Sequence, residues 1–304
     1  MEKFEVHILG CGSALPTARH LGSCQVVNIR EKLFMIDCAE GAQMQLRRNK
    51  QKFSHLNNIF ISHLHGDHCF GLMGLISTFA LLGRMAPLHI YGPKDLEKVF
   101  RPQIDYFCKG IEYKIELHEF ETKDSALIYE DRSVSIYTIP LSHRIPCCGF
   151  LFKEKELQRH IKRDCIDAFG IPLCYINNIK AGQDYITPDG EIIPNHLLTT
   201  PADPARSYAY CSDTIYLPQN AEIIKNVDLL YHESTFGEDN SERAKQTFHS
   251  TASEAAKMAK LCNAKRLIIG HFSARYENES VLLEEAKGIF KKTILANENL
   301  HISI

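Results

Sequence analysis

The chain has 304 residues, of which 44% are hydrophobic and 24% are charged, and this length suffices for one large or two small cores. Its formal net charge of -2 excludes an overall basic surface, so a nucleic acid could be held only by a local basic patch. The eleven cysteines are scattered without a disulfide-framework spacing, and neither a signal peptide nor a membrane-spanning apolar run is present, which predicts a cytoplasmic protein with no membrane segment.

The apolar residues predict strands alternating with helices along most of the chain. In chain order we expect strands at 4–9, 25–29 and 33–36, a helix at 42–48, a strand at 58–62, a helix at 72–82, strands at 133–139, 208–211 and 228–231, a helix at 253–261, a strand at 266–269 and a helix at 281–290. This order indicates an α/β fold in one domain over residues 1–304. The charged segment from 153 to about 180 breaks the rhythm between two predicted strands, so we interpret it as an insertion.

Side chains that can bind metal ions follow directly after several predicted strands. The clearest case is the stretch SHLHGDH at 62–68, and single candidates follow other strands at His143, Asp213 and His271. Ends of strands in α/β sheets are where binding sites are built. Imidazole and carboxylate are ligands expected of zinc or a similar borderline cation.

The number of these ligands predicts two metal ions rather than one. The expected first set is His63, His65 and His143, the second set is Asp67, His68 and His271, and Asp213 can bridge the two ions. Two cations a few ångströms apart can share a hydroxide and neutralise charge on a phosphoryl or acyl oxygen. The pattern of ligands therefore predicts a hydrolase. Asp67 can also orient the attacking water or accept its proton.

At this point the motifs resemble those of a known superfamily. The HxHxDH stretch at 63–68 is similar to the signature of the metallo-β-lactamase superfamily, which implies an αββα four-layer sandwich. Within it the chain resembles the short form of the ribonuclease Z family along nearly its whole length. The similar segments are GCGSALPT at 10–17, DCAEGAQ at 37–43, SDT at 212–214, HESTF at 232–236, HST at 249–251 and GHFSARY at 270–276.

The superfamily signature alone leaves thioester hydrolases, lactamases, phosphodiesterases and oxidoreductases open. The aspartate of the SDT motif argues against lactamases with a cysteine at the bridging site, although Cys211 lies only two residues before Asp213. The resemblance further implies that Glu233 and His249 lie beside the metals. A histidine oriented by a glutamate can donate a proton to the departing 3′ oxygen of an RNA strand.

The insertion resembles the flexible arm with which ribonuclease Z enzymes grip transfer RNA away from the cleavage site. Its candidate RNA-binding residues are Lys153, Lys155, Arg159, Lys162 and Arg163, and Arg275 beyond the last ligand is a further candidate for a phosphate contact. Acidic residues are interleaved with these cations, so an amphipathic helical hairpin with a solvated face is the alternative.

The resemblance implies a zinc-dependent endoribonuclease that removes the 3′ trailer from precursor tRNA near the discriminator base and leaves a 3′-hydroxyl. It implies two Zn²⁺ per subunit, with Mn²⁺ or another divalent ion as the alternative, and a homodimer in which one subunit's arm serves the other's site. Two other functions stay open: a phosphodiesterase of the same superfamily that acts on a small molecule, and a metal-stabilised RNA-binding protein without turnover.

Overall fold

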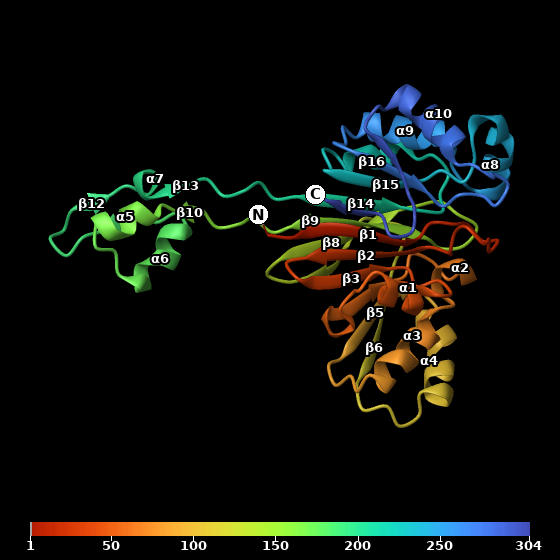
Figure 1. Cartoon of the computed structure of the whole chain (residues 1–304), viewed down its shortest axis with the longest axis horizontal. Helices are drawn as coiled ribbons and strands as arrows, with labels where there is room; N and C mark the ends of the chain where they lie inside the picture. The colour runs from red at the N-terminus through yellow and green to blue at the C-terminus, as the bar shows by residue number, and fades with distance from the viewer. Residues whose placement is uncertain (1) are drawn as a thin grey trace. The chain divides into compact units, whose positions relative to one another are not determined.

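The computed structural model describes residues 2–304, which form two compact units. The larger unit comprises Glu2–Lys153 and Arg206–Ile304, and the smaller one comprises Glu154–Ala205. The larger unit is built on two seven-stranded sheets (Figure 1). No helix among residues 2–304 is long and apolar enough to cross a membrane.

The first sheet holds most of the N-terminal half of the chain. Its strands, in spatial order, are β18 (His301–Ser303), β1 (Phe4–Gly10), β2 (Cys24–Ile29), β3 (Lys32–Ile36), β4 (Leu56–Phe60), β5 (Leu88–Pro93) and β6 (Ile115–Phe120). Pairing is antiparallel from β18 to β3 and parallel from β3 to β6. The C-terminal strand β18 therefore closes the edge beside β1.

The second sheet holds the central and C-terminal strands of the larger unit. In spatial order these are β17 (Thr293–Leu295), β16 (Leu267–Gly270), β15 (Leu229–Glu233), β14 (Ser207–Cys211), β9 (Cys148–Glu154), β8 (Val134–Pro140) and β7 (Leu127–Glu130). The strands from β14 to β17 are parallel, so their carboxyl ends lie at one edge.

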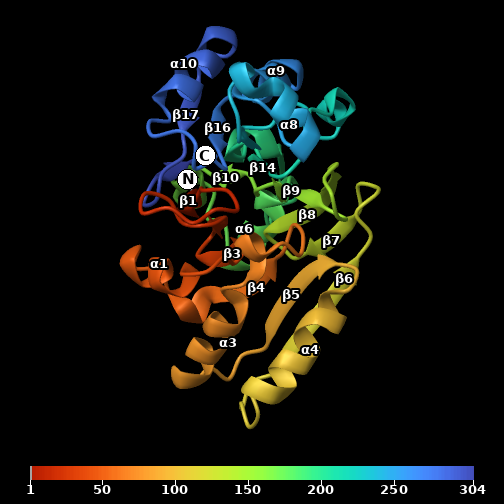
Figure 2. The same cartoon turned by 90° about the vertical axis from the view of Figure 1, so that its right-hand side faces the viewer.

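The two sheets pack face to face through aromatic side chains. Phe34 of β3 lies 6.0 Å from Phe152 of β9, and Phe60 of β4 lies 5.6 Å from Phe150, measured between ring centroids. Helices cover the outer faces: α1 (Ala42–Arg48), α3 (Leu72–Leu81) and α4 (Leu96–Phe107) lie beside the first sheet, and α8 (Ser241–Thr247), α9 (Ala252–Leu261) and α10 (Ser280–Ile289) lie beside the second (Figure 2). These four layers confirm the predicted αββα sandwich.

The predicted elements agree closely with the structure where one face is plainly apolar. Helix α1 has the predicted bounds, whereas β4 ends at Phe60, two residues earlier than expected, which leaves Ser62 in the loop that carries the histidines. Strands β5, β6 and β9 and helix α4 lack a sequence prediction. In α4, Pro102 lies inside the helix, and β6 carries Glu and His on one face, so neither has a simple pattern.

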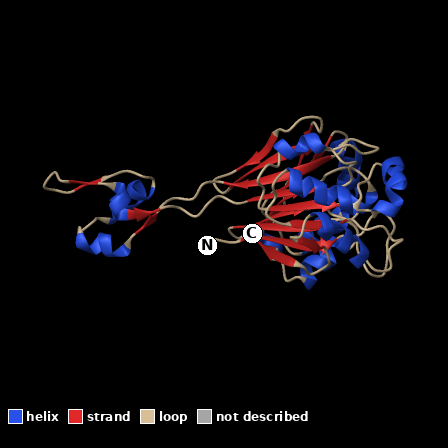
Figure 3. Ribbon diagram, turned by 90° about the horizontal axis from the view of Figure 1, so that it is seen from above, coloured by secondary structure: helices blue, strands red, loops and turns tan. Residues whose placement is uncertain are grey.

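The smaller unit has its own core and continues past the predicted end at Lys180 to Ala205. Its elements are β10 (His160–Ile161), α5 (Arg163–Ala168), α6 (Leu173–Lys180), β11 (Tyr185–Ile186), β12 (Ile192–Ile193), α7 (Asn195–Leu198) and β13 (Thr199–Thr200), which Figure 3 shows by class. Ile171, Ile179, Tyr185, Ile193 and Leu198 form its core. The strand β13 pairs with β10, so the end of this unit lies beside its beginning. At two residues, β13 is too short to show a periodic pattern in the sequence.

Replacing Gly71 by alanine is expected to destabilise the larger unit. A Cβ atom at this position, which precedes α3, would lie 1.9 Å from the carbonyl oxygen of Ala39. Because that oxygen belongs to the backbone, the chain must shift, and we expect the free energy of unfolding to fall by about 3 kcal/mol. Gly288→Ala is the matched control, since no atom lies within 4 Å of its Cβ and alanine favours the helix α10 by about 0.5 to 1 kcal/mol. Urea unfolding of both variants measures the difference; equal stabilities would contradict the steric argument.

Candidate metal centre and active site

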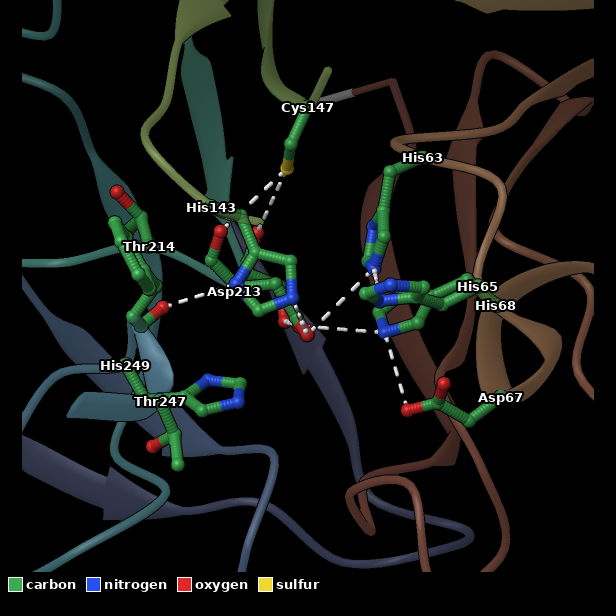
Figure 4. A network of polar contacts seen from close by, with 12 residues as sticks. His63, His65, Asp67, His68, His143, Cys147, Asp213, Thr214, Thr247 and His249 are labelled. Atoms are coloured by element: carbon green, nitrogen blue, oxygen red, sulfur yellow. Dashed lines mark hydrogen bonds and ion pairs between the residues drawn. The ribbon is translucent and has the colours of Figure 1, made fainter. Parts of the chain in front are cut away.

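The loops that carry the predicted ligands meet at one edge of the larger unit. His63 and His65 precede the short helix α2 (Gly66–Cys69), which contains Asp67 and His68. His143 follows β8, Asp213 follows β14 and His271 follows β16. In Figure 4, His63, His65 and His68 lie together on one side of the site, and Asp213 and His143 lie on the other. All seven predicted ligands are thus brought together.

The seven residues divide into two groups that share Asp213. One group is His63, His65, His143 and Asp213, and the other is Asp67, His68, Asp213 and His271, with the donor atoms of each group within 4.8 Å of one another. Oδ2 of Asp213 lies 3.6 Å from Nε2 of His63 and 3.7 Å from Nε2 of His143. Oδ1 lies 3.2 Å from Nε2 of His68 and 3.1 Å from Nε2 of His271. Each carboxylate oxygen therefore faces one group, which is the arrangement of a bridging ligand.

The donor set fits divalent metal ions. Four donors around one zinc ion at bond lengths near 2.05 Å lie about 3.3 Å apart, and the separations in both groups scatter around this value. The Nε2 atoms of His68 and His271 are buried and make no hydrogen bond among the described residues, so their lone pairs face the shared space. The site is therefore one for divalent metal.

The pKa shifts of His63 and Asp213 favour the forms that bind a metal ion, whereas at His68 burial is outweighed by Asp213, Asp37 and Asp67, which raise its pKa. Burial, followed by the neighbouring His68, lowers the pKa of His63 well below its ordinary value, so the imidazole is neutral and its lone pair is available. Burial alone would raise the pKa of Asp213. The surrounding His271, His68 and His63 outweigh that effect and hold its pKa well below the usual range, so the carboxylate is charged.

A second carboxylate, Asp37, orients the ligands of the first sheet. It follows β3 and is fully buried. Its Oδ2 accepts hydrogen bonds from Nδ1 of His68 at 2.8 Å and from the hydroxyls of Tyr210 and Ser62 at 2.7 and 3.0 Å, while Oδ1 accepts from the backbone N–H of Ser62 at 2.8 Å. Because the proton of His68 is held on Nδ1, Nε2 is left bare for a metal.

His143 and His271 are oriented by hydrogen bonds to Nδ1 as well. Nδ1 of His143 donates to the carbonyl of Phe248 at 3.0 Å, and Nδ1 of His271 donates to the hydroxyl of Thr235 at 2.9 Å. Asp213 and His271 also have left-handed backbone conformations, with φ of 60° and 61°, which non-glycine residues adopt at an energetic cost. The surrounding hydrogen bonds keep this strained backbone in place.

Glu233 and His249 form a buried pair beside the second group. Nδ1 of His249 lies 2.8 Å from Oε1 of Glu233, which also accepts the backbone N–H of Thr214 at 2.8 Å. Oε2 accepts from the hydroxyl of Thr235 at 2.5 Å, so the pair is linked to the ligand His271. Burial lowers the pKa of His249, but the Glu233 carboxylate raises it more, to about 9. Since Nδ1 faces Glu233, Nε2 is the nitrogen available to a substrate.

The loop that carries His249 is fixed from both sides. Ser250 Oγ donates to the carbonyl of Thr214 at 2.6 Å. Thr251 caps helix α9 in a reciprocal arrangement, in which its side chain accepts from the N–H of Glu254 and its own N–H donates to the Glu254 carboxylate. The position of His249 therefore follows from the start of a helix, which the HST motif encodes.

Two cavities open beside the metal ligands. The smaller, about 230 Å³, is lined by ligands, His249 and three arginines, Arg144, Arg243 and Arg275. None of the three guanidinium groups forms an ion pair with a carboxylate in the part of the chain that the structure describes. Of these arginines only Arg275 was predicted, because Arg144 and Arg243 stand in loops or helices without a recognisable pattern.

The larger cavity, about 820 Å³, shares His65 and Asp67 with the smaller one but has mostly apolar walls. They come from the loop at 13–22, the segment 39–41 and Phe70, whose side chain is 75% exposed. No local pattern predicts this cavity, because its walls come from segments that are distant from one another in the chain.

The predicted RNA-binding residues of the insertion are not all in the smaller unit. Lys153 belongs to the larger unit, where its Nζ lies 5.5 Å from the ring centroid of Tyr137. Within the smaller unit, Nε of Arg159 donates to Thr199 and Nζ of Lys162 donates to the carbonyl of Leu197. Lys155 and Arg163 also belong to this unit. With five basic and eight acidic residues, the smaller unit has a formal charge of -3.

The geometry can be compared with known proteins. A curated protein of Bacteroides thetaiotaomicron named ribonuclease Z is 64% identical over 304 residues, covering 100% of this chain and 96% of the relative. The chain belongs to the ribonuclease Z family. The crystal structure of the short form of human tRNase Z is similar with a TM-score of 0.71 and 26% identity, covering 99% of each chain. YhfI of Bacillus subtilis, a metallo-β-lactamase fold protein, matches with a TM-score of 0.70 and 18% identity over 100% of both chains, which shows the fold.

A sequence profile of the family described as Anti-Pycsar protein Apyc1 matches residues 4–155. This part of the chain contains the HxHxDH motif and His143 but not Asp213, Glu233, His249 or His271. The ribonuclease Z relative, by contrast, matches over all of these positions. Cys211, which the sequence left as a competing ligand, is buried in the hydrophobic core and is absent from the metal-binding groups among residues 2–304.

Replacing Asp37 by asparagine is expected to weaken metal binding. The amide keeps the size of the side chain, but it can present an N–H to Nδ1 of His68 and so move the imidazole proton to the metal-facing nitrogen. Loss of such a ligand-orienting carboxylate typically lowers metal affinity about 10- to 100-fold. Competition with a chelator measures this, with the exposed Asp105→Asn as the matched control. Unchanged affinity in Asp37→Asn would contradict the role of Asp37.

Proposed function

We propose that this chain is an endoribonuclease that removes the 3′ trailer from precursor tRNA, cutting near the discriminator base and leaving a 3′-hydroxyl. The observation that carries the proposal is the Glu233–His249 pair, which lies beside two groups of metal-binding side chains that share Asp213. The chain also matches a ribonuclease Z relative over its full length. The proposed metals are two Zn²⁺ per chain, with Mn²⁺ as the alternative. His63, His65 and His143 would hold one ion and Asp67, His68 and His271 the other, with Asp213 shared between the two groups.

The two cations supply Lewis acidity, which favours ionisation of water and neutralises charge on the phosphoryl oxygens. Asp67 lies on the edge of the second group, with Oδ2 3.5 Å from His68 and 3.6 Å from His271. It lines both cavities, so its carboxylate can contact a water molecule as well as a metal. We assign it the orientation of the attacking water.

His249 protonates the departing 3′ oxygen in this proposal. Its side chain is only 14% exposed, and it lines the smaller cavity together with the ligands. Glu233 fixes the ring and stabilises its charged form through the 2.8 Å contact to Nδ1. An imidazolium held in this way is a proton donor of fixed direction.

The three arginines of the smaller cavity are proposed to bind the phosphates next to the cleaved bond. Arg144 follows the ligand His143 directly, and Arg275 is four residues beyond His271. Arg243 approaches from α8. Guanidinium groups without internal carboxylate partners are suited to phosphate oxygens, which they bind in a bidentate manner.

The larger cavity is proposed to hold a nucleotide beside the cleaved phosphate. A cavity of about 820 Å³ with mostly apolar walls suits a base better than a phosphate. Phe70 presents an exposed ring at this cavity, and bases stack on such rings without regard to sequence. An RNA strand can thus place a phosphate at the metals and a base against Phe70.

The smaller unit is proposed to bind the tRNA away from the cleaved bond. Because the net charge of this unit is -3, it does not attract phosphates as a whole. The proposed phosphate contacts are therefore made by individual cations, Lys155, Arg159, Lys162 and Arg163. We further propose a homodimer in which this unit serves the partner's site. The eleven cysteines are all free thiols, which supports a reducing cytoplasm as the location.

Cleavage of a 3′-extended tRNA transcript tests the function. We expect release of one discrete trailer by the purified chain, loss of cleavage after chelation, and recovery on addition of Zn²⁺ or Mn²⁺. In His249→Ala the rate should fall about a hundred- to ten-thousand-fold because the proton donor is lost, while bound metal, measured by elemental analysis, stays the same.

Two outcomes would contradict the proposal. Absence of a discrete trailer with every divalent metal would exclude tRNA processing. Equal hydrolysis of a small phosphodiester and of the tRNA, unaffected by alanine at Arg159, Lys162 and Arg163, would favour the small-molecule phosphodiesterase. That substrate is included because the HxHxDH signature by itself leaves phosphodiesterases of the same superfamily open.

Phe70→Ala is expected to lower kcat/KM for the tRNA about 5- to 100-fold, because a stacking platform for one base is removed. Cleavage of a small phosphodiester, which has no neighbouring base, should stay nearly unchanged. Phe107→Ala is the matched control: this phenylalanine is 70% exposed, against 75% for Phe70, but belongs to α4 and does not line either cavity at the metals. Equal effects of the two variants on the tRNA would contradict a role of Phe70 in stacking.

A further inference from the structure

Another group of side chains that could bind a metal ion lies on the strands β5 and β6, apart from the site around Asp213. His89, Glu116 and His118 place one donor atom each within 4.8 Å of the others. Side chains alternate along a strand, and Tyr91, two residues after His89, packs against the core between the sheets. All three therefore lie on the sheet face that points toward the second sheet, and between 28% and 38% of each side chain remains exposed.

The separations of the three donor atoms match a metal ion of ordinary size. Nδ1 of His89 lies 3.1 Å from Nε2 of His118 and 3.3 Å from Oε2 of Glu116, and the last pair is 3.9 Å apart. A point equidistant from these three atoms lies about 2.0 Å from each of them, which is the usual bond length from zinc to imidazole nitrogen or carboxylate oxygen. An ion placed slightly out of this plane leaves room for water on its open side.

The backbone holds this arrangement without help from a loop. In the parallel ladder His89 is paired with Glu116, and Tyr91 is paired with His118. The ring of Tyr91 stacks on that of His118 at 4.5 Å and 17°, which fixes the plane of the imidazole. Lys114 Nζ lies 2.6 Å from Oε1 of Glu116, so Oε2 is the oxygen directed to the histidines.

We propose that His89, Glu116 and His118 bind one borderline divalent cation, Zn²⁺ or a similar ion such as Co²⁺ or Ni²⁺, separately from the proposed catalytic metals. Two imidazoles and one carboxylate favour these ions over Mg²⁺ and Ca²⁺, which prefer oxygen donors. Without a metal, one imidazole N–H donates to the other imidazole at 3.1 Å. Binding needs no net loss of a proton, because the shared proton moves to the far nitrogen of its ring.

The position of the site predicts what the ion does. β6 is the outermost strand of the first sheet and is paired only with β5 among the described strands. A cation with ligands on both strands adds a link to this edge. Since the ion binds the folded chain and not the unfolded one, it raises the melting temperature as its concentration increases. None of the three ligands lines either cavity at the proposed catalytic metals, and no part of the proposed RNA cleavage depends on them.

Zinc stoichiometry measured by equilibrium dialysis and elemental analysis tests the site. At micromolar free Zn²⁺ we expect His118→Gln and His89→Gln to bind one ion fewer per chain than the unaltered protein, while tRNA cleavage is retained. His55→Gln is the matched control. Nδ1 of this histidine contacts the backbone carbonyl of Glu31, in the turn between β2 and β3 of the first sheet, and His55 belongs to no metal-binding group among the described residues.

The melting temperature, as a second measurement, shows whether the variants are folded. The melting temperature should rise with Zn²⁺ by several degrees more in the unaltered protein than in His118→Gln, while both melt alike in the presence of chelator. Equal zinc stoichiometry in the unaltered protein and both variants would overturn the proposal and leave the three side chains as a hydrogen-bonded group. Because the comparison counts a difference of one ion, it is valid whether or not the chain cleaves tRNA.

Discussion

The metal centre depends on one buried carboxylate, that of Asp37. A charged group in the core costs several kcal/mol unless its oxygens are fully hydrogen-bonded. Asp37 meets this condition only with donors from both sheets, because Ser62 and His68 follow β4 while Tyr210 lies on β14. The same hydrogen bonds that offset the cost of burial leave the metal-facing nitrogen of His68 bare. The hydrogen bonds of Asp37 therefore join the two sheets and orient the metal ligand His68 at the same time.

The ligand set follows the same division between the sheets. His63, His65, Asp67 and His68 come from the first sheet, and His143, Asp213 and His271 come from the second. Neither sheet alone can complete either group, since Asp213 belongs to both. Metal affinity and folding of the larger unit must then be coupled, because the unfolded chain offers no such site. The left-handed backbones of Asp213 and His271 are kept by this mutual support.

The sequence predicted the ligands better than the surroundings that orient them. A polar residue directly after an apolar strand is a local signal, and it located His63, Asp213 and His271. Thr235 and the carbonyl of Phe248, which hold the rings of His271 and His143, have no local signal because their role arises only when distant loops meet. Strands β5 and β6 were missed for a related reason. His89, Glu116 and His118 interrupt their apolar pattern, and these side chains form the additional cation site proposed above. The compact unit of residues 154–205 extends beyond the segment predicted as an insertion, because β13 and the approach to β14 are too short or irregular to show a period.

Charge explains how a chain with a net charge of -2 can bind RNA. The carboxylates of Asp67 and Asp213 would balance half of the charge of the two proposed cations. The positive field felt by a phosphate then depends strongly on Arg144, Arg243 and Arg275, whose charge no carboxylate neutralises among the described residues. The smaller unit, with eight acidic and five basic residues, cannot attract RNA by net charge. The proposed contribution of this unit to tRNA binding would therefore rest on the placement of a few cations and of exposed apolar side chains such as Leu173 and Tyr175.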